Sequence, residues 1–82
     1  MLVIKYTRAA ETFEKQNKPQ NAIKDYSEAI KLEPDNADLY VHRGNLHIAT
    51  AAYEKAIEDF SDAIKHDPQD TENFRKRALC YV

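Results

Sequence analysis

One thirteen-residue segment of this chain, residues 22–34, recurs as residues 56–68, and this recurrence limits the possible folds more than any other feature. The two copies align without a gap, and eight of the thirteen pairs are identical. Where Tyr26 is replaced by Phe60, the position stays aromatic. A fixed period of this length is typical of a stack of similar units, each of which contacts mainly its neighbours. The sequence therefore predicts a repeat protein rather than a single closed globule.

Each copy of the segment has the pattern of an amphipathic helix. Ile23, Tyr26 and Ile30 are separated by three and four residues, which places them on one face of a helix. The second copy has the same spacing, and alanines flank both apolar stripes at positions 22, 29, 56 and 63. Such small side chains allow a neighbouring helix to approach closely. Pro34 and Pro68 are expected to end the two helices, because proline lacks a backbone donor and disfavours helical geometry in the residue before it.

The same reasoning along the chain predicts five helices. Two are expected over about 3–16 and 19–32, and a fourth over 53–66. The third should begin after a capping Asp35 or Asn36, and the fifth after Asp70 or Thr71. The fifth is expected to include Phe74, Ala78, Leu79, Tyr81 and Val82. On the fourth helix, Asp59 is expected among the solvent-exposed residues.

The turn between the third and fourth helices is weakly encoded. Residues 49–52 read Ala-Thr-Ala-Ala, so no Gly, Asn or Pro stops the helix there. A bent turn is favoured, because Tyr40, Ile57 and Phe60 lose their mutual burial if the helix pair opens. The alternative is one continuous helix, which would let two chains exchange helices.

The composition excludes several classes of protein. The chain has 82 residues and a net charge of −2, which favours neither a bulk nucleic-acid binder nor an acidic tail. No apolar run approaches the length of about 18 residues that a membrane span needs, so we expect an intracellular protein, cytoplasmic or nuclear. The single cysteine, Cys80, agrees with a reducing compartment. With Gly44 as the only glycine, phosphate-binding glycine-rich loops are absent, and no cofactor or enzyme activity is expected.

Some residues have both a structural and a functional interpretation. His42 and His47 are five residues apart, a spacing that favours ordinary surface and packing histidines over a metal site. Cys80 is better explained as a small packing residue than as a nucleophile. The acidic run over 54–72 is expected to be a solvated helix face, with docking of a basic partner as the alternative. The basic cluster over 75–77 raises RNA binding as a further alternative, but it would neutralise few phosphates.

With this period and pattern, the chain resembles a known family, the tetratricopeptide repeats, which are 34-residue helix-turn-helix units. The resemblance covers the unit 3–36, the unit 37–70 and a partial unit 71–82. The residues that carry it are Tyr6, Ala10, Phe13, Ala22, Tyr26, Ala29 and Pro34 in the first unit, Tyr40, Gly44, Ala56, Phe60, Ala63 and Pro68 in the second, and Phe74, Ala78 and Tyr81 in the third. His47 and Ala51 depart from the pattern, since an aromatic residue and a glycine are usual there. The resemblance implies an all-α fold, a right-handed stack of antiparallel helix pairs with about two and a third repeats.

The resemblance also implies a function, the binding of a peptide or another protein in a concave groove lined by the first helix of each pair. The expected groove residues are Arg8, Glu11, Asp38, His42, Asn45, Arg75 and Lys76. The alternative is a self-association element that forms a homodimer through the unpaired C-terminal helix. Its expected contact residues are Phe74, Leu79, Tyr81 and Val82.

One ligand class is expected to be excluded. Some members of the family hold the acidic carboxyl terminus of heat-shock chaperones between Lys, Asn and Arg side chains. In this chain the corresponding positions hold Thr7, Glu11, His42, Glu72 and Lys76. Only Lys76 is positive, and both glutamates would repel an acidic ligand. We therefore expect the chain not to bind chaperone C-terminal tails.

Overall fold

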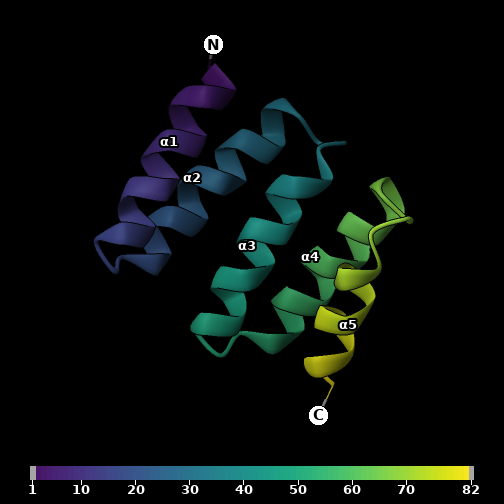
Figure 1. The fold of residues 1–82 in the computed structure, drawn as a ribbon. Coiled ribbons are helices and arrows are strands. Elements are labelled where there is room, and N and C mark those ends of the chain that lie inside the picture. The colour runs from purple at the N-terminus through teal and green to yellow at the C-terminus, as the bar shows by residue number, and fades with distance from the viewer. Residues whose placement is uncertain (1, 82) are drawn as a thin grey trace.

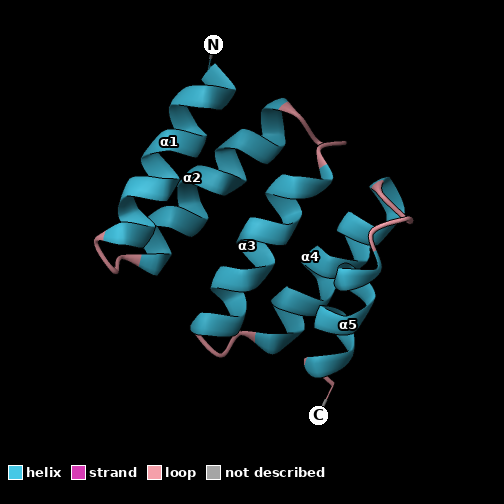
Figure 2. Ribbon diagram, viewed as in Figure 1, coloured by secondary structure: helices cyan, strands magenta, loops and turns pink. Residues whose placement is uncertain are grey.

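Five α-helices joined by short turns make up residues 2–81, the part of the chain that the computed structural model describes. Neighbouring helices run antiparallel and form a stack, in which each helix packs on the next (Figure 1). The helices are α1 (Leu2–Lys15), α2 (Pro19–Leu32), α3 (Ala37–Ala49), α4 (Tyr53–His66) and α5 (Thr71–Leu79). Figure 2 shows only helices and connecting turns over these residues, which confirms the predicted all-α fold.

The helix ends follow from the local sequence. Asn36 caps α3, and its side chain accepts a hydrogen bond from the backbone N–H of Asp38 at 3.1 Å. Asp70 caps α5 in the same way, through the N–H of Glu72 at 3.1 Å. Pro19 begins α2 at a position where its missing donor has no helical partner to lose. Asn36 therefore marks the boundary between the pair α1–α2 and the pair α3–α4, and Asp70 marks the boundary between α3–α4 and α5.

The weakly encoded turn is bent. The helix α3 ends at Ala49, and Ala51 has a φ angle of 60°, in the left-handed region. Asn17 holds the equivalent position between α1 and α2 and has a φ angle of 58°, so both turns use the same geometry. Asparagine adopts this conformation readily, whereas an alanine side chain is strained by roughly 1–2 kcal/mol. The packing of α3 on α4 therefore offsets the strain at Ala51.

The core confirms the role predicted for the small residues. Five alanines of α1, α2 and α4 are completely buried at the helix contacts: Ala10, Ala22, Ala29, Ala56 and Ala63. The large aromatic residues Tyr26 and Phe60 fill the space between them. At Gly44 the approach is closest, because a Cβ atom there would lie 2.9 Å from the Phe60 ring. This contact accounts for the only glycine in the chain.

The last helix is shorter than the sequence predicted. The helix α5 ends at Leu79, and Tyr81 lies in the turn that follows it. Val82 lies outside the described residues. No helix within residues 2–81 is both long enough and apolar enough to cross a membrane.

Candidate functional site

The residues predicted to line a groove come from the three odd-numbered helices. Arg8 and Glu11 lie on α1, and Arg75 and Lys76 on α5. The helix between them contributes Asp38, His42 and Asn45. All of these side chains are exposed except Lys76, which is half-buried. We call these seven residues the odd-helix face.

The centre of the odd-helix face is held by an aromatic stack. The imidazole of His42 lies parallel to the buried ring of Tyr26, with 5.3 Å between the ring centroids and 4° between the planes. The Tyr26 hydroxyl donates to the Glu14 carboxylate, so α1, α2 and α3 are joined at this point. Burial, followed by the hydrogen bond and charge of Glu14, raises the pKa of Tyr26 above its usual range. Tyr26 therefore stays protonated and keeps donating to Glu14.

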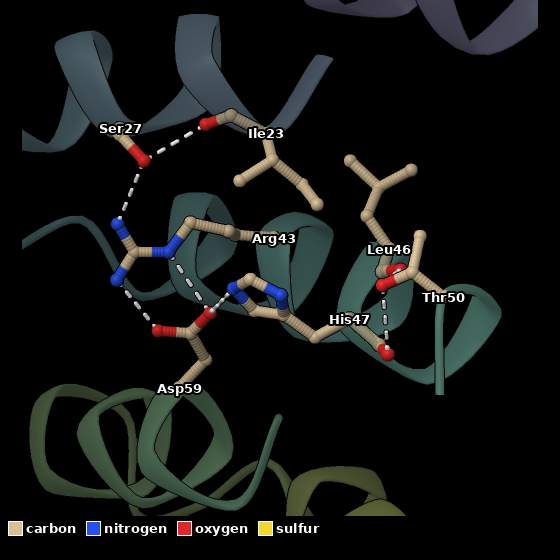
Figure 3. Close-up of polar contacts among 7 residues, drawn as sticks. All are labelled: Ile23, Ser27, Arg43, Leu46, His47, Thr50 and Asp59. Atoms are coloured by element: carbon tan, nitrogen blue, oxygen red, sulfur yellow. Dashed lines mark hydrogen bonds and ion pairs between the residues drawn. The ribbon is translucent and has the colours of Figure 1, made fainter. Parts of the chain in front are cut away.

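A second polar arrangement, largely buried, lies between α2, α3 and α4 (Figure 3). There Arg43 lies between two helices, and Asp59 accepts its Nε–H at 2.9 Å and its Nη2–H at 2.6 Å. On the other side, Arg43 donates through Nη1 to the Ser27 hydroxyl at 3.0 Å. These residues line a pocket of about 280 Å³ together with Ile23, His47, Lys55 and Glu58. Because Arg43 on α3 is hydrogen-bonded to Ser27 of α2 and to Asp59 of α4, it links three helices.

The expectation that Asp59 is exposed was wrong. Only 2% of the residue is exposed, because its carboxylate turns toward α3 and is neutralised by Arg43. A charge count along one helix misses such a partner on another helix. The sequence did contain one indication that Asp59 has a structural role, because the matching position of the preceding copy is also an aspartate, Asp25.

His47 belongs to the same buried group. Its Nε2 atom lies 3.5 Å from Asp59 Oδ2, and the residue is 8% exposed. Burial lowers the pKa of His47, although the Asp59 carboxylate acts in the opposite direction. The histidine thus fills the place of the usual aromatic residue as a neutral, packed ring.

The groups considered for catalysis or metal binding are dispersed. His42 faces the exposed side of α3, whereas His47 is buried. Across residues 2–81, no group of three His, Cys, Asp or Glu side chains has the geometry of a metal site. Cys80 is buried against Ala56 and Phe60, and this burial raises the pKa of its thiol. The structure thus places Cys80 as a packing residue.

The predicted self-association residues lie at the end of the stack. Phe74 and Leu79 on α5, and Tyr81 after it, are all exposed. Val82, the fourth member of this set, lies outside the described residues. The basic cluster shares this helix, where Arg75 pairs with Glu72 at 3.5 Å.

Among solved structures, the fold is similar to the second tetratricopeptide-repeat domain of Spaghetti (RPAP3), a structure bound to the HSP90 peptide SRMEEVD. The TM-score is 0.90 and the sequence identity is 26%, over 99% of this chain and 75% of that one. The likeness therefore extends over all five helices.

This neighbour contradicts the exclusion of chaperone tails, and that expectation was wrong. The exclusion compared five positions one at a time and counted Lys76 as the only cation. Arg8 and Arg75 are the sequence neighbours of Thr7 and Lys76 and are both exposed, and Glu72 lies 3.5 Å from the guanidinium of Arg75. Recognition of an acidic peptide depends on the summed field of a surface, which a comparison of single positions does not measure.

Two family models match the sequence. One, described as TPR repeat, matches residues 5–50, and the other, described as tetratricopeptide repeat, matches residues 37–70. Both agree with the period of the sequence and with the stack of helix pairs. The chain belongs to the tetratricopeptide repeat family and, like that family, has the architecture of a protein-interaction module.

Proposed function

We propose that this chain is a non-catalytic interaction module that binds an extended peptide segment of another protein on the odd-helix face. The observation that carries the proposal is the TM-score of 0.90 with a domain that is itself bound to a peptide. The exposed polar side chains of α1, α3 and α5 supply the recognition groups, while α2 and α4 hold these helices in place.

The charges of the odd-helix face favour an acidic ligand. Arg8, Arg75 and Lys76 are positive, and they lie on the first and last of the three helices. Cations there attract carboxylates of a peptide that crosses the face, and they increase its rate of association. The acids of the face, Glu11 and Asp38, favour one orientation of the ligand by repelling its carboxylates locally.

The middle helix supplies groups that suit a peptide backbone. Asn45 is exposed and has both a donor and an acceptor, which match a backbone C=O and N–H. His42 is held in place by its stack on Tyr26, so little side-chain freedom is lost when a ligand contacts it. We propose that His42 and Asn45 position the ligand and that the cations at the two ends attract it.

A calorimetric titration with the peptide SRMEEVD tests this proposal. We expect binding, and we expect the double variant Arg8→Glu, Lys76→Glu to weaken it by about tenfold or more, equivalent to about 1.4 kcal/mol. Lys31→Glu is a matched charge reversal on α2, where the lysine side chain is exposed and lies outside the odd-helix face. This control should leave the affinity unchanged. Equal affinities of the wild type and the double variant would contradict binding at this face, and absence of binding would contradict the acidic ligand class.

The alternative function, homodimer formation through α5, is supported by a separate observation. Phe74, Leu79 and Tyr81 are all exposed, and Leu79 is 64% exposed. Sedimentation equilibrium over a range of concentrations tests it: a homodimer dissociates on dilution, and Leu79→Glu shifts it toward monomer. A constant monomer mass would exclude the alternative.

A further inference from the structure

A smaller pocket than that of Arg43 lies beside the turn between α1 and α2, at the same end of the stack as the last turn of α3 (Figure 1). It has a volume of about 230 Å³ and is lined by Glu14, Asn17, Pro19, Leu46 and Ala49. We call this space the turn pocket. Among the described residues that line it, only Glu14 is charged, so the pocket combines one carboxylate with an uncharged lining.

The turn pocket adjoins the odd-helix face along α3. Leu46 lies four residues after His42, and Ala49 lies four residues after Asn45. Residues four apart on a helix are neighbours on its surface. A peptide that contacts His42 and Asn45 can therefore place a side chain in the turn pocket without leaving the face.

The carboxylate of Glu14 is held in position before a ligand arrives. Its Oε1 atom accepts a hydrogen bond from the hydroxyl of Tyr26, whose ring is buried. A carboxylate has about four acceptor sites, so Glu14 keeps room for further donors. Lys15 and Lys18 are exposed and do not line the pocket, and no side chain within residues 2–81 forms an ion pair with Glu14. The pocket thus contains a positioned anion without a cation.

From this geometry we propose that the turn pocket binds an arginine side chain of the peptide ligand, whose guanidinium pairs with Glu14. The inference rests on the peptide-binding function proposed above and assigns Glu14 to it as a specificity residue. The aliphatic stem of the arginine packs against Pro19 and Leu46. Its planar set of donors reaches both the Glu14 carboxylate and the side-chain oxygen of Asn17.

The charges of the odd-helix face and of the turn pocket together select a ligand of mixed charge. Arg8, Arg75 and Lys76 attract carboxylates, whereas Glu14 attracts a cation. A purely acidic segment leaves Glu14 without a partner and close to the carboxylates of the ligand, which lowers its affinity. The peptide SRMEEVD has the required pattern, because one arginine precedes its three acidic residues. Glu14 therefore distinguishes acidic segments that carry an arginine from those that do not.

Calorimetric titrations of the 82-residue chain with SRMEEVD and with SQMEEVD, in which glutamine replaces the arginine, test this inference. We expect the wild type to bind the arginine peptide about threefold more tightly, as for an exposed ion pair. In Glu14→Gln the two peptides should bind equally, and the new amide still accepts the hydrogen bond of Tyr26. The matched control is Glu28→Gln on α2, where the carboxylate pairs with Lys31, and it should keep the threefold difference.

NMR spectra of the same complexes locate the arginine independently of affinity. At saturation with SRMEEVD, the side-chain amide of Asn17 and the backbone amide of Ala49 should shift, since both residues line the pocket. With SQMEEVD these shifts should be smaller.

The possible failures separate this inference from the proposed function. Equal affinity of the two peptides for the wild type would overturn it, and so would a threefold difference that persists in Glu14→Gln. Bound SRMEEVD that leaves Asn17 and Ala49 unshifted would mean that the arginine lies elsewhere. In each of these cases the binding of SRMEEVD stands and only the role of the turn pocket is wrong. Absence of binding by both peptides would contradict the inference and the proposed function together.

Discussion

Replacing Asn73 with leucine is expected to stabilise the protein, although it removes a polar side chain from a first-turn position of a helix. Asn73 is 1% exposed, and neither Nδ2 nor Oδ1 has a hydrogen-bond partner among the described residues. Its counterpart in the preceding repeat is Leu39, which is buried in the main core cluster. The position is therefore an apolar site that holds an unpaired amide.

The magnitude follows from two terms of the same sign. An unpaired buried amide costs about 1–3 kcal/mol, and burying a leucine contributes about 1.5–3 kcal/mol. Both side chains branch at Cγ, but leucine is more apolar, and imperfect packing of the new methyl groups offsets part of the gain. We expect a net increase of about 2 kcal/mol in the free energy of unfolding. For a domain of this size, that corresponds to a rise in Tm of about 8–16 °C.

Chemical denaturation and thermal melting measure this change directly. The reaction of Cys80 with a thiol reagent adds a local measurement, since this buried thiol lies against α4 and should react more slowly when α5 is held more firmly. Asn45→Leu is the matched control on α3, where the side chain is exposed, and it should change stability by less than about 0.5 kcal/mol. A neutral or destabilising effect of Asn73→Leu would refute the view that the amide is buried without a partner.

Three further predictions concern the turn at Ala51, the ion pair of Arg43 and Asp59, and the buried His47. Ala51→Gly should raise the free energy of unfolding by about 1 kcal/mol, because glycine adopts the observed φ of 60° without strain. The control Ala49→Gly, at the end of α3, should lower the free energy of unfolding, and thermal melting of both variants checks the sign. Arg43→Met should lower it by about 3 kcal/mol, because the Asp59 carboxylate stays buried without its cation, and the double variant with Asp59→Leu should recover much of the loss in denaturant titrations. Burial lowers the pKa of His47 in the folded state, so the unfolded state binds more protons, and stability should fall as pH drops below about 6.5. The free energy of unfolding, measured from about pH 7.5 to 5.5, should depend less on pH in His47→Gln than in the wild type.

Much of the fold could be predicted because the chain repeats itself. The spacing of Ile23, Tyr26 and Ile30 predicted a helix that the structure confirms over Pro19–Leu32. The buried alanines on either side were predicted for the same reason, since a close contact between helices needs small residues at a fixed spacing. The bent turn at Ala51 was harder to predict, because its cause is the packing of α3 on α4 and not the local sequence.

The predictions that were wrong concern properties that depend on contacts between helices or on neighbouring side chains. Asp59 was expected in solvent because it lies in an acidic stretch, yet the partner that buries it comes from another helix, 16 residues away in the sequence. The exclusion of chaperone tails failed because single positions were compared and the neighbouring cations Arg8 and Arg75 were not counted. The position of Asn73 in the core follows from its register with Leu39, but nothing in the sequence indicates why an amide occupies it.

The most direct test of the central claim is a two-dimensional NMR titration of the isotope-labelled chain with SRMEEVD. Binding on the odd-helix face predicts that the largest shifts map to Arg8, His42, Asn45, Arg75 and Lys76. Shifts confined to the pocket between α2 and α4, or none at millimolar peptide, would contradict the account.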